Sequence, residues 1–103
     1  HNARKRNKLA DMIKSFASKE TKAFFAGDMV KRYQAFAAAA ERKLTLLDEA
    51  KALDDLKIPM ENKLEALRGD RNGQHSIRIN QQYRLCFRWQ DGDAYDVEIV
   101  DYH

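Results

Sequence analysis

The chain has 103 residues, of which 44% are hydrophobic and 34% are charged, and its formal net charge at pH 7 is +3. This length suits one domain with one core, and this composition excludes an intrinsically disordered chain. No apolar run approaches the roughly 20 residues that span a bilayer and no signal peptide is visible, so we expect no membrane partner.

Few residues are available for metal or thiol chemistry. Cys86 is the only cysteine, which excludes an internal disulfide and is typical of a cytoplasmic protein. The three histidines are scattered, without metal-ligand spacing, and no glycine-rich phosphate loop is present. The sequence therefore predicts no metal and no cofactor. We interpret Cys86 as a small strand residue rather than as a nucleophile.

The positive charge is unevenly distributed. Residues 1–11 hold four basic side chains against Asp11, whereas residues 12–103 hold fifteen basic and fifteen acidic ones. We interpret residues 1–11 as a disordered extension or a cloning remnant, and a basic arm that contacts RNA or a partner is the alternative. Residues 12–103 are predicted to form the domain. Within it, residues 68–88 are basic and residues 89–103 are acidic.

The first predicted elements are a strand over residues 12–16 and a short helix. Ser18 is a suitable N-cap for a helix through Phe25, and Gly27 is its predicted stop. Phe24 and Phe25 are predicted to anchor this helix to the core.

A second, longer helix is predicted after Asp28, which could cap it, and its pattern decays near Ala50. The face of this helix that lies away from its apolar residues is charged and is predicted to be exposed to solvent. The apolar residues recur along the helix at spacings of three and four residues: Tyr33, Phe36, Ala40, Leu44 and Leu47.

The last third of the chain alternates as strands do. Residues 63–67 are predicted to form a strand with Leu64 and Glu65 on opposite faces, and residues 75–79 and 83–89 form two more. Asp91 and Gly92 predict a tight hairpin turn into a final strand. One face of these strands is apolar: Ile77, Ile79, Tyr83, Leu85, Phe87, Trp89, Tyr95, Val97 and Ile99.

The order of elements indicates an α+β protein of the pattern β-α-α-β-β-β, with a mostly antiparallel sheet and both helices on one face. The other face carries Arg78, Arg84 and Arg88. Guanidinium groups on alternate positions suit the phosphates of RNA or DNA. They could equally pair with Asp96 and Glu98 across the sheet, and the pattern alone leaves both interpretations open.

The chain end supplies further groups for chemistry. His103 titrates near neutral pH, and Tyr102 carries a phenol. With Arg84 nearby, these groups suffice for metal-free phosphodiester cleavage, in which a base takes the proton of a ribose 2′-OH and an acid protonates the leaving oxygen. A frayed chain end is the alternative.

Several segments resemble the HigB branch of the RelE/ParE toxin superfamily. The resemblance covers residues 12–103 and is most specific after residue 63. It rests on residues 12–16 (MIKSF), 63–71 (KLEALRGDR), 73–80 (GQHSIRIN), 83–87 (YRLCF), 92–95 (GDAY) and 101–103 (DYH).

The resemblance implies the RelE-like microbial RNase fold and a toxin of a type II toxin–antitoxin pair. Such toxins cut mRNA in the A site of the 70S ribosome and stop translation. The implied partner is a HigA-like antitoxin with a helix-turn-helix domain, through which alone the toxin meets operator DNA. A ParE-like inhibitor of gyrase and a non-catalytic RNA-binding domain are the alternatives.

The resemblance also implies roles for single residues. Arg84 matches an arginine that contacts the scissile phosphate, and Arg68 stands where the family often has a lysine with that role. Asp101, Tyr102 and His103 match the catalytic C-terminal group. Glu65 stands where some relatives have a histidine, so the general base is either Glu65 or Asp101, with His103 as the acid. His75 is predicted to lie on the core face, so it does not substitute. The remaining arginines predicted to bind RNA phosphate are Arg71, Arg78 and Arg88.

Overall fold

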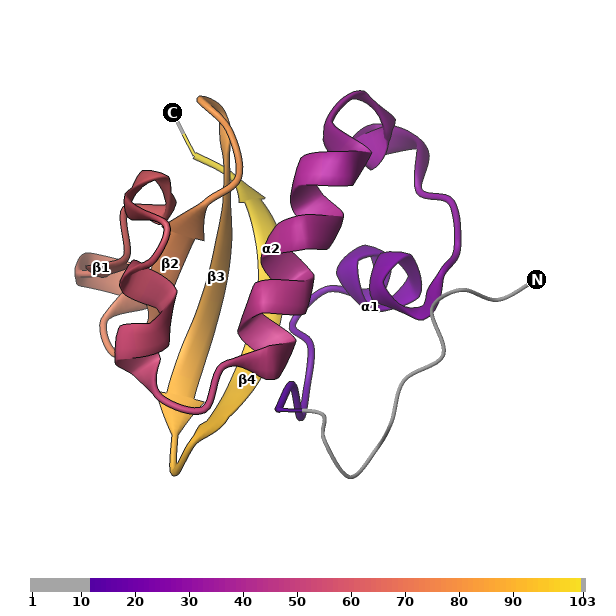
Figure 1. Cartoon of the computed structure of the whole chain (residues 1–103). Helices are drawn as coiled ribbons and strands as arrows, with labels where there is room; N and C mark the ends of the chain where they lie inside the picture. Colours follow the sequence, from indigo (N-terminus) through magenta and orange to yellow (C-terminus); the bar gives the residue numbers. More distant parts are fainter. Residues whose placement is uncertain (1–11, 103) are drawn as a thin grey trace.

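The computed structural model describes residues 12–102, in which helices pack against a four-stranded antiparallel sheet (Figure 1). The two α-helices are α1 (Lys19–Ala26) and α2 (Ala37–Glu49). The strands, in their order across the sheet, are β1 (Glu65–Ala66), β2 (His75–Arg78), β3 (Tyr83–Gln90) and β4 (Asp93–Asp101). Short 3₁₀ helices connect these elements: η1 (Lys31–Phe36), η2 (Leu53–Lys57), η3 (Met60–Asn62) and η4 (Gly69–Arg71). The predicted α+β class is confirmed.

Helix α1 begins and ends where the sequence predicts. The Ser18 hydroxyl accepts a hydrogen bond from the backbone N–H of Thr21 at 3.1 Å, which satisfies one of the free donors of the first turn. Gly27 ends the helix with a φ of 113°, a conformation that a side chain would strain. Phe24 and Phe25 are buried, as expected for core anchors.

The second helix begins later than predicted, and Asp28 does not cap it. The segment starts as η1 after Val30, which makes no side-chain cap, and becomes α-helical only at Ala37. Tyr33 explains this start, because its buried ring packs edge-on against Phe24 with centroids 5.3 Å apart. The apolar stripe is confirmed except that Phe36 is only partly buried against the core. The other four residues are at most 1% exposed: Tyr33, Ala40, Leu44 and Leu47.

The predicted strand over residues 12–16 is only partly formed. It makes two isolated parallel bridges with β4, between Ile13 and Ala94 and between Phe16 and Val97. Asp96 lies between these two contacts on β4 and has a φ of 53°, so the strand bends there. The bend prevents a continuous ladder.

The predicted strand over residues 63–67 shortens to the two residues of β1. Lys63 has a left-handed φ of 46°, which is incompatible with extended backbone. The expected division of faces holds, since Leu64 packs against the core and Glu65 is exposed.

The turn between β3 and β4 is the predicted hairpin. Asp91 and Gly92 connect the two strands directly, with φ values of 54° and 84°. Positive φ at both positions is what a type I′ turn requires, and its twist matches that of the flanking strands.

The predicted inward position of Tyr95 is wrong. Cys86 pairs with Glu98 but Arg88 pairs with Tyr95, so β4 contains one extra residue at a bulge. Directly paired side chains lie on the same face of a sheet, so Tyr95 shares the face of Arg88. Ala94 takes the inward position instead and is fully buried.

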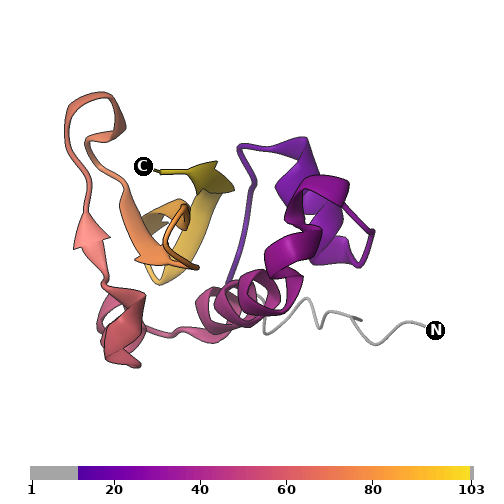
Figure 2. The ribbon, with the colours of Figure 1, turned by 90° about the horizontal axis from the view of Figure 1, so that it is seen from above.

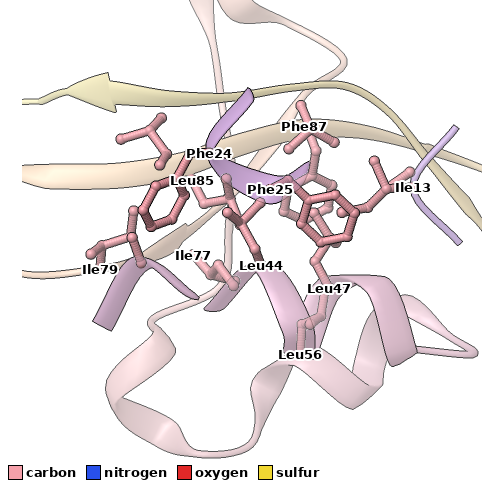
Figure 3. Packing of buried hydrophobic residues seen from close by; sticks show 14 of the residues in the cluster. Ile13, Phe24, Phe25, Leu44, Leu47, Leu56, Ile77, Ile79, Leu85 and Phe87 are labelled. Carbon is pink, nitrogen blue, oxygen red and sulfur yellow. The ribbon is translucent and has the colours of Figure 1, made fainter. Parts of the chain in front are cut away.

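The core lies between the helices and one face of the sheet. Figure 2 shows both α-helices on the same side of the strands. In Figure 3, Leu44 and Leu47 of α2 gather with Ile77, Leu85 and Phe87 of the central strands, all at most 1% exposed. Within residues 12–102, none of the helices is long and apolar enough to cross a membrane. Because both α-helices cover one face of the sheet, its other face is available to position polar groups.

Candidate active site

Arg84 is the best-fixed cation on the open face of the sheet. It lies on β3, directly opposite Arg78 of β2. Its Nε donates a hydrogen bond to the Ser76 hydroxyl at 2.7 Å, and its Nη2 donates to the Lys63 carbonyl at 2.6 Å. The side chain is 11% exposed. Because two of its nitrogens are held by the protein, the guanidinium has a defined orientation and little freedom to lose when an anion binds.

Tyr102 covers this guanidinium from the end of the chain. The central carbon of the Arg84 guanidinium lies 5.8 Å from the ring centroid, a cation–π contact. The backbone N–H of Tyr102 donates to the Gln82 carbonyl at 2.6 Å, so the end of β4 lies beside the turn between β2 and β3 (Figure 1). This hydrogen bond holds the backbone of Tyr102 in place beside that turn.

Arg84 and Tyr102 share an open pocket of about 280 Å³, here called the Arg84 pocket. The residues that line it come from the segment after η3, from β2, the β2–β3 turn and β3, and from the end of the chain after β4: Lys63, Arg78, Asn80, Gln81, Arg84 and Tyr102. Three of the six are cationic and none is acidic. A pocket of this charge suits an anion such as a phosphodiester.

Neither of the two candidate bases lines this pocket. The Glu65 carboxylate is 3.9 Å from Arg84 Nε and is about half exposed. Asp101 accepts a hydrogen bond from Gln82 Nε2 at 3.1 Å and lines a neighbouring pocket of about 520 Å³ with Arg71 and Tyr102. Tyr102 thus lines both pockets. His103 lies outside the described residues.

The other candidate arginines are engaged in different ways. Arg71 donates to Glu98 at 2.9 Å, and this hydrogen bond raises the pKa of Arg71. Arg88 lies 3.4 Å from the Asp96 carboxylate. Cross-strand pairing therefore accounts for Arg88, whereas Glu98 is taken by Arg71 rather than by a β3 arginine. Arg68 is exposed before η4, and only Arg78 joins Arg84 in its pocket.

Cys86 and His75 are placed as the alternation predicts. Cys86 is fully buried on the face opposite the core, and burial raises the pKa of its thiol to about 11. His75 stacks on Phe87 with centroids 6.2 Å apart. No group of three His, Cys, Asp or Glu residues suited to a metal occurs within residues 12–102.

The raised pKa of Cys86 gives a first testable prediction. The thiolate is the nucleophile, and burial raises the pKa of this thiol from its ordinary value of 9.0 to about 11. We therefore expect iodoacetamide to label Cys86 about 100-fold more slowly in the folded protein at pH 8. Mass spectrometry of folded and urea-unfolded samples measures this ratio. Equal labelling rates would contradict the buried position.

Sequence reasoning missed the two groups that orient Arg84. The position of Ser76 was predictable, because alternation along β2 puts it on the same face as Arg78. The strand β2 pairs with β3, which carries Arg84. The position of the Lys63 carbonyl was not predictable from the sequence, since its direction depends on the left-handed backbone of Lys63 itself. Both are positioning groups that act through Arg84.

A Ser76→Ala substitution isolates this positioning role. It leaves Arg84 Nε without its side-chain acceptor, a loss of about 1 kcal/mol, and so we expect roughly a fivefold fall in RNA affinity at the Arg84 pocket. Titration with a non-cleavable oligonucleotide measures it. Ser76→Thr, which keeps the hydroxyl, is the matched control and should restore binding. Equal affinity of the alanine and threonine variants would show that the hydroxyl has no such role.

Comparisons with known proteins identify the family of this chain. Residues 14–103 match the family described as the RelE-like toxin of type II toxin–antitoxin system HigB. The chain is 42% identical over 87 residues to Toxin HigB-1 of Vibrio cholerae, an alignment that covers 81% of this chain and 90% of that protein. It is 33% identical over 93 residues to Endoribonuclease HigB of Proteus vulgaris, covering 89% of this chain and all of that protein.

A solved structure supports the fold independently. The YoeB–YefM complex from Staphylococcus aureus contains a chain that superposes with a TM-score of 0.52 at 20% sequence identity, covering 88% of this chain and 97% of that one. At this identity the likeness concerns the fold alone. Taken with the match over residues 14–103, these findings show that the chain belongs to the HigB family of RelE-like toxins of type II toxin–antitoxin systems.

Proposed function

We propose that this toxin is an endoribonuclease that cleaves mRNA in the ribosomal A site and thereby inhibits translation. The observation that carries the proposal is the Arg84 pocket, where an oriented guanidinium lies beneath a tyrosine ring among further cations. The name of its relative Endoribonuclease HigB, aligned over that protein's whole length, supports the same activity.

The proposed reaction requires only side-chain groups. A general base takes the proton of the ribose 2′-OH, the 2′-oxygen attacks the adjacent phosphorus, and a general acid protonates the leaving 5′-oxygen. Arg84 stabilises the extra negative charge on the phosphorane, and the bonds to Ser76 and Lys63 hold it ready to do so. The products are a 2′,3′-cyclic phosphate and a free 5′-hydroxyl.

Three residues are our candidates for the acid–base roles. Glu65 is the first candidate for the base, because its carboxylate lies beside Arg84, and Asp101 is the second. His103 is the candidate acid. Tyr102 packs on Arg84, the side chain proposed to bind the phosphate. Arg68 and the three arginines of the sheet region are proposed to attract the RNA backbone: Arg71, Arg78 and Arg88.

A translation extract tests the proposal. The full chain is added to the extract and the ends of the mRNA are mapped. We expect cuts in frame with the codon in the A site, and intact mRNA under stalled translation would overturn the nuclease assignment. Growth inhibition that persists after alanine replaces Arg84 would instead favour a ParE-like action on gyrase.

The proposed protein partner is a HigA-like antitoxin with a helix-turn-helix domain, which alone would contact operator DNA. The family description and the complexed state of the YoeB chain in its solved structure support an antitoxin partner. Co-purification of this chain with the product of a neighbouring reading frame tests it.

A further inference from the structure

A second pocket adjoins the Arg84 pocket on the side of α2. Its volume is about 380 Å³, and Arg42, Lys43 and Glu61 line it from α2 and η3. The two pockets share three lining residues, Arg78, Asn80 and Gln81, so they are neighbours at the turn after β2. The cations of the second pocket, Arg42, Lys43 and Arg78, outnumber its single carboxylate. We call it the α2 pocket.

Lys43 is held in a position that suits an anion. Its ammonium donates a hydrogen bond to Asn62, a buried side chain whose own amide nitrogen donates to the Leu56 carbonyl at 3.1 Å. Burial is the main reason why the pKa of Lys43 is lowered, and nearby Arg42 lowers it further, whereas Glu61 raises it. The Lys43 ammonium is therefore held in place, and its positive charge is only partly balanced by the negative charge of Glu61.

The charged face of α2 is thus more than a solvated helix surface. Two cations adjacent in sequence face an open pocket together with Arg78, which also lines the Arg84 pocket. A nucleic-acid strand carries a negative charge at every nucleotide, and cations in a contiguous groove are the usual way to follow its backbone.

We propose that the α2 pocket is a second phosphate subsite, which binds the backbone of the same RNA strand whose scissile phosphate lies at Arg84. This inference rests on the proposed nuclease function. Arg42 and Lys43 supply the charge, Arg78 bridges the two subsites, and the turn at Asn80 and Gln81 lies between them. The subsite recognises phosphate and so adds affinity without base specificity.

Binding of RNA of two lengths tests the subsite. The chain is titrated with a dinucleotide and with a longer strand, each carrying a 2′-O-methyl group at the scissile ribose so that no cleavage occurs. The double substitution Arg42→Gln, Lys43→Gln should weaken binding of the longer strand about tenfold. It should also reduce the slope of log affinity against log salt by about 1.4, since two phosphate contacts are lost. The dinucleotide, whose single phosphodiester is the scissile one, should bind the variant and the wild type equally.

The matched control is Lys22→Gln, Lys31→Gln, which removes the same charge from exposed positions of α1 and η1. Equal effects of the two double substitutions would overturn the subsite and leave the proposed function standing. Loss of binding that also affects the dinucleotide would overturn it too. Because Lys43 supports buried Asn62, thermal denaturation accompanies the titrations, and Arg42→Glu, at an exposed position, repeats the test without that risk. Failure of the wild type to bind either RNA would count against the nuclease function itself.

Discussion

We expect replacement of Arg84 by lysine to lower the rate of the proposed mRNA cleavage by about 100- to 1,000-fold, the cost of losing one oriented donor to a transition-state oxyanion. A lysine keeps the positive charge but has a single nitrogen, so it cannot bond to Ser76 and the Lys63 carbonyl and still reach a phosphate. Single-turnover cleavage of mRNA on programmed ribosomes measures the effect.

The control for this substitution is Arg32→Lys. Arg32 also forms a side-chain ion pair, with Glu20 at 2.9 Å, but it lies on η1 and is more than half exposed. We expect the control to cleave at the wild-type rate. Cleavage by the Arg84→Lys protein at a rate close to that of the control would contradict the role of the oriented guanidinium.

Replacing Asp48 by alanine lowers the free energy of unfolding by about 3 kcal/mol, because a charged acceptor with two backbone donors is lost. Asp48 lies in the last turn of α2 and is 5% exposed. Its Oδ1 accepts hydrogen bonds from the N–H groups of Met12 and Ile13, both at 3.1 Å. A carboxylate at a helix C-terminus is disfavoured by about 0.3–1 kcal/mol, which is less than these bonds contribute.

Urea denaturation measures this effect as a lower midpoint with an unchanged slope. Asp48→Asn is the matched control, since it keeps an oxygen acceptor of the same shape, and we expect it to lose only about 1 kcal/mol. An alanine variant as stable as the asparagine variant would show that these bonds do not hold residues 12–16 against α2 and β4.

The fold was predicted best where a residue acts on its immediate neighbours. The hydroxyl of Ser18, the left-handed backbone of Gly27 and the Asp91–Gly92 turn each act over four residues or fewer, and each is found as expected. Asp28 was an equally good cap by local rules. It does not cap the second helix because the burial of Tyr33, against a residue nine positions earlier, sets where that segment begins.

The candidate site was predicted in part. Strict alternation along β3 correctly puts Arg84 on the face opposite Leu85, and Tyr102 covers its guanidinium, whereas Asp101 pairs with Tyr83. The cross-strand pairs were less predictable, since one extra residue at the β4 bulge shifts every partner on its far side. Tyr95 is outward for that reason, although its own sequence neighbourhood predicts an inward position.

The sequence by itself determined which side chains of β3 lie on the face away from the core, because the alternation of a strand is a property of the backbone. It determined both ends of α1 and the buried stripe of α2 for the same local reason. Only the tertiary structure decided how these groups are used. The Lys63 carbonyl orients Arg84, and Arg42 of α2 meets Arg78 of β2 across a shared pocket. Contacts between residues so far apart in the chain depend on packing, which no local pattern records.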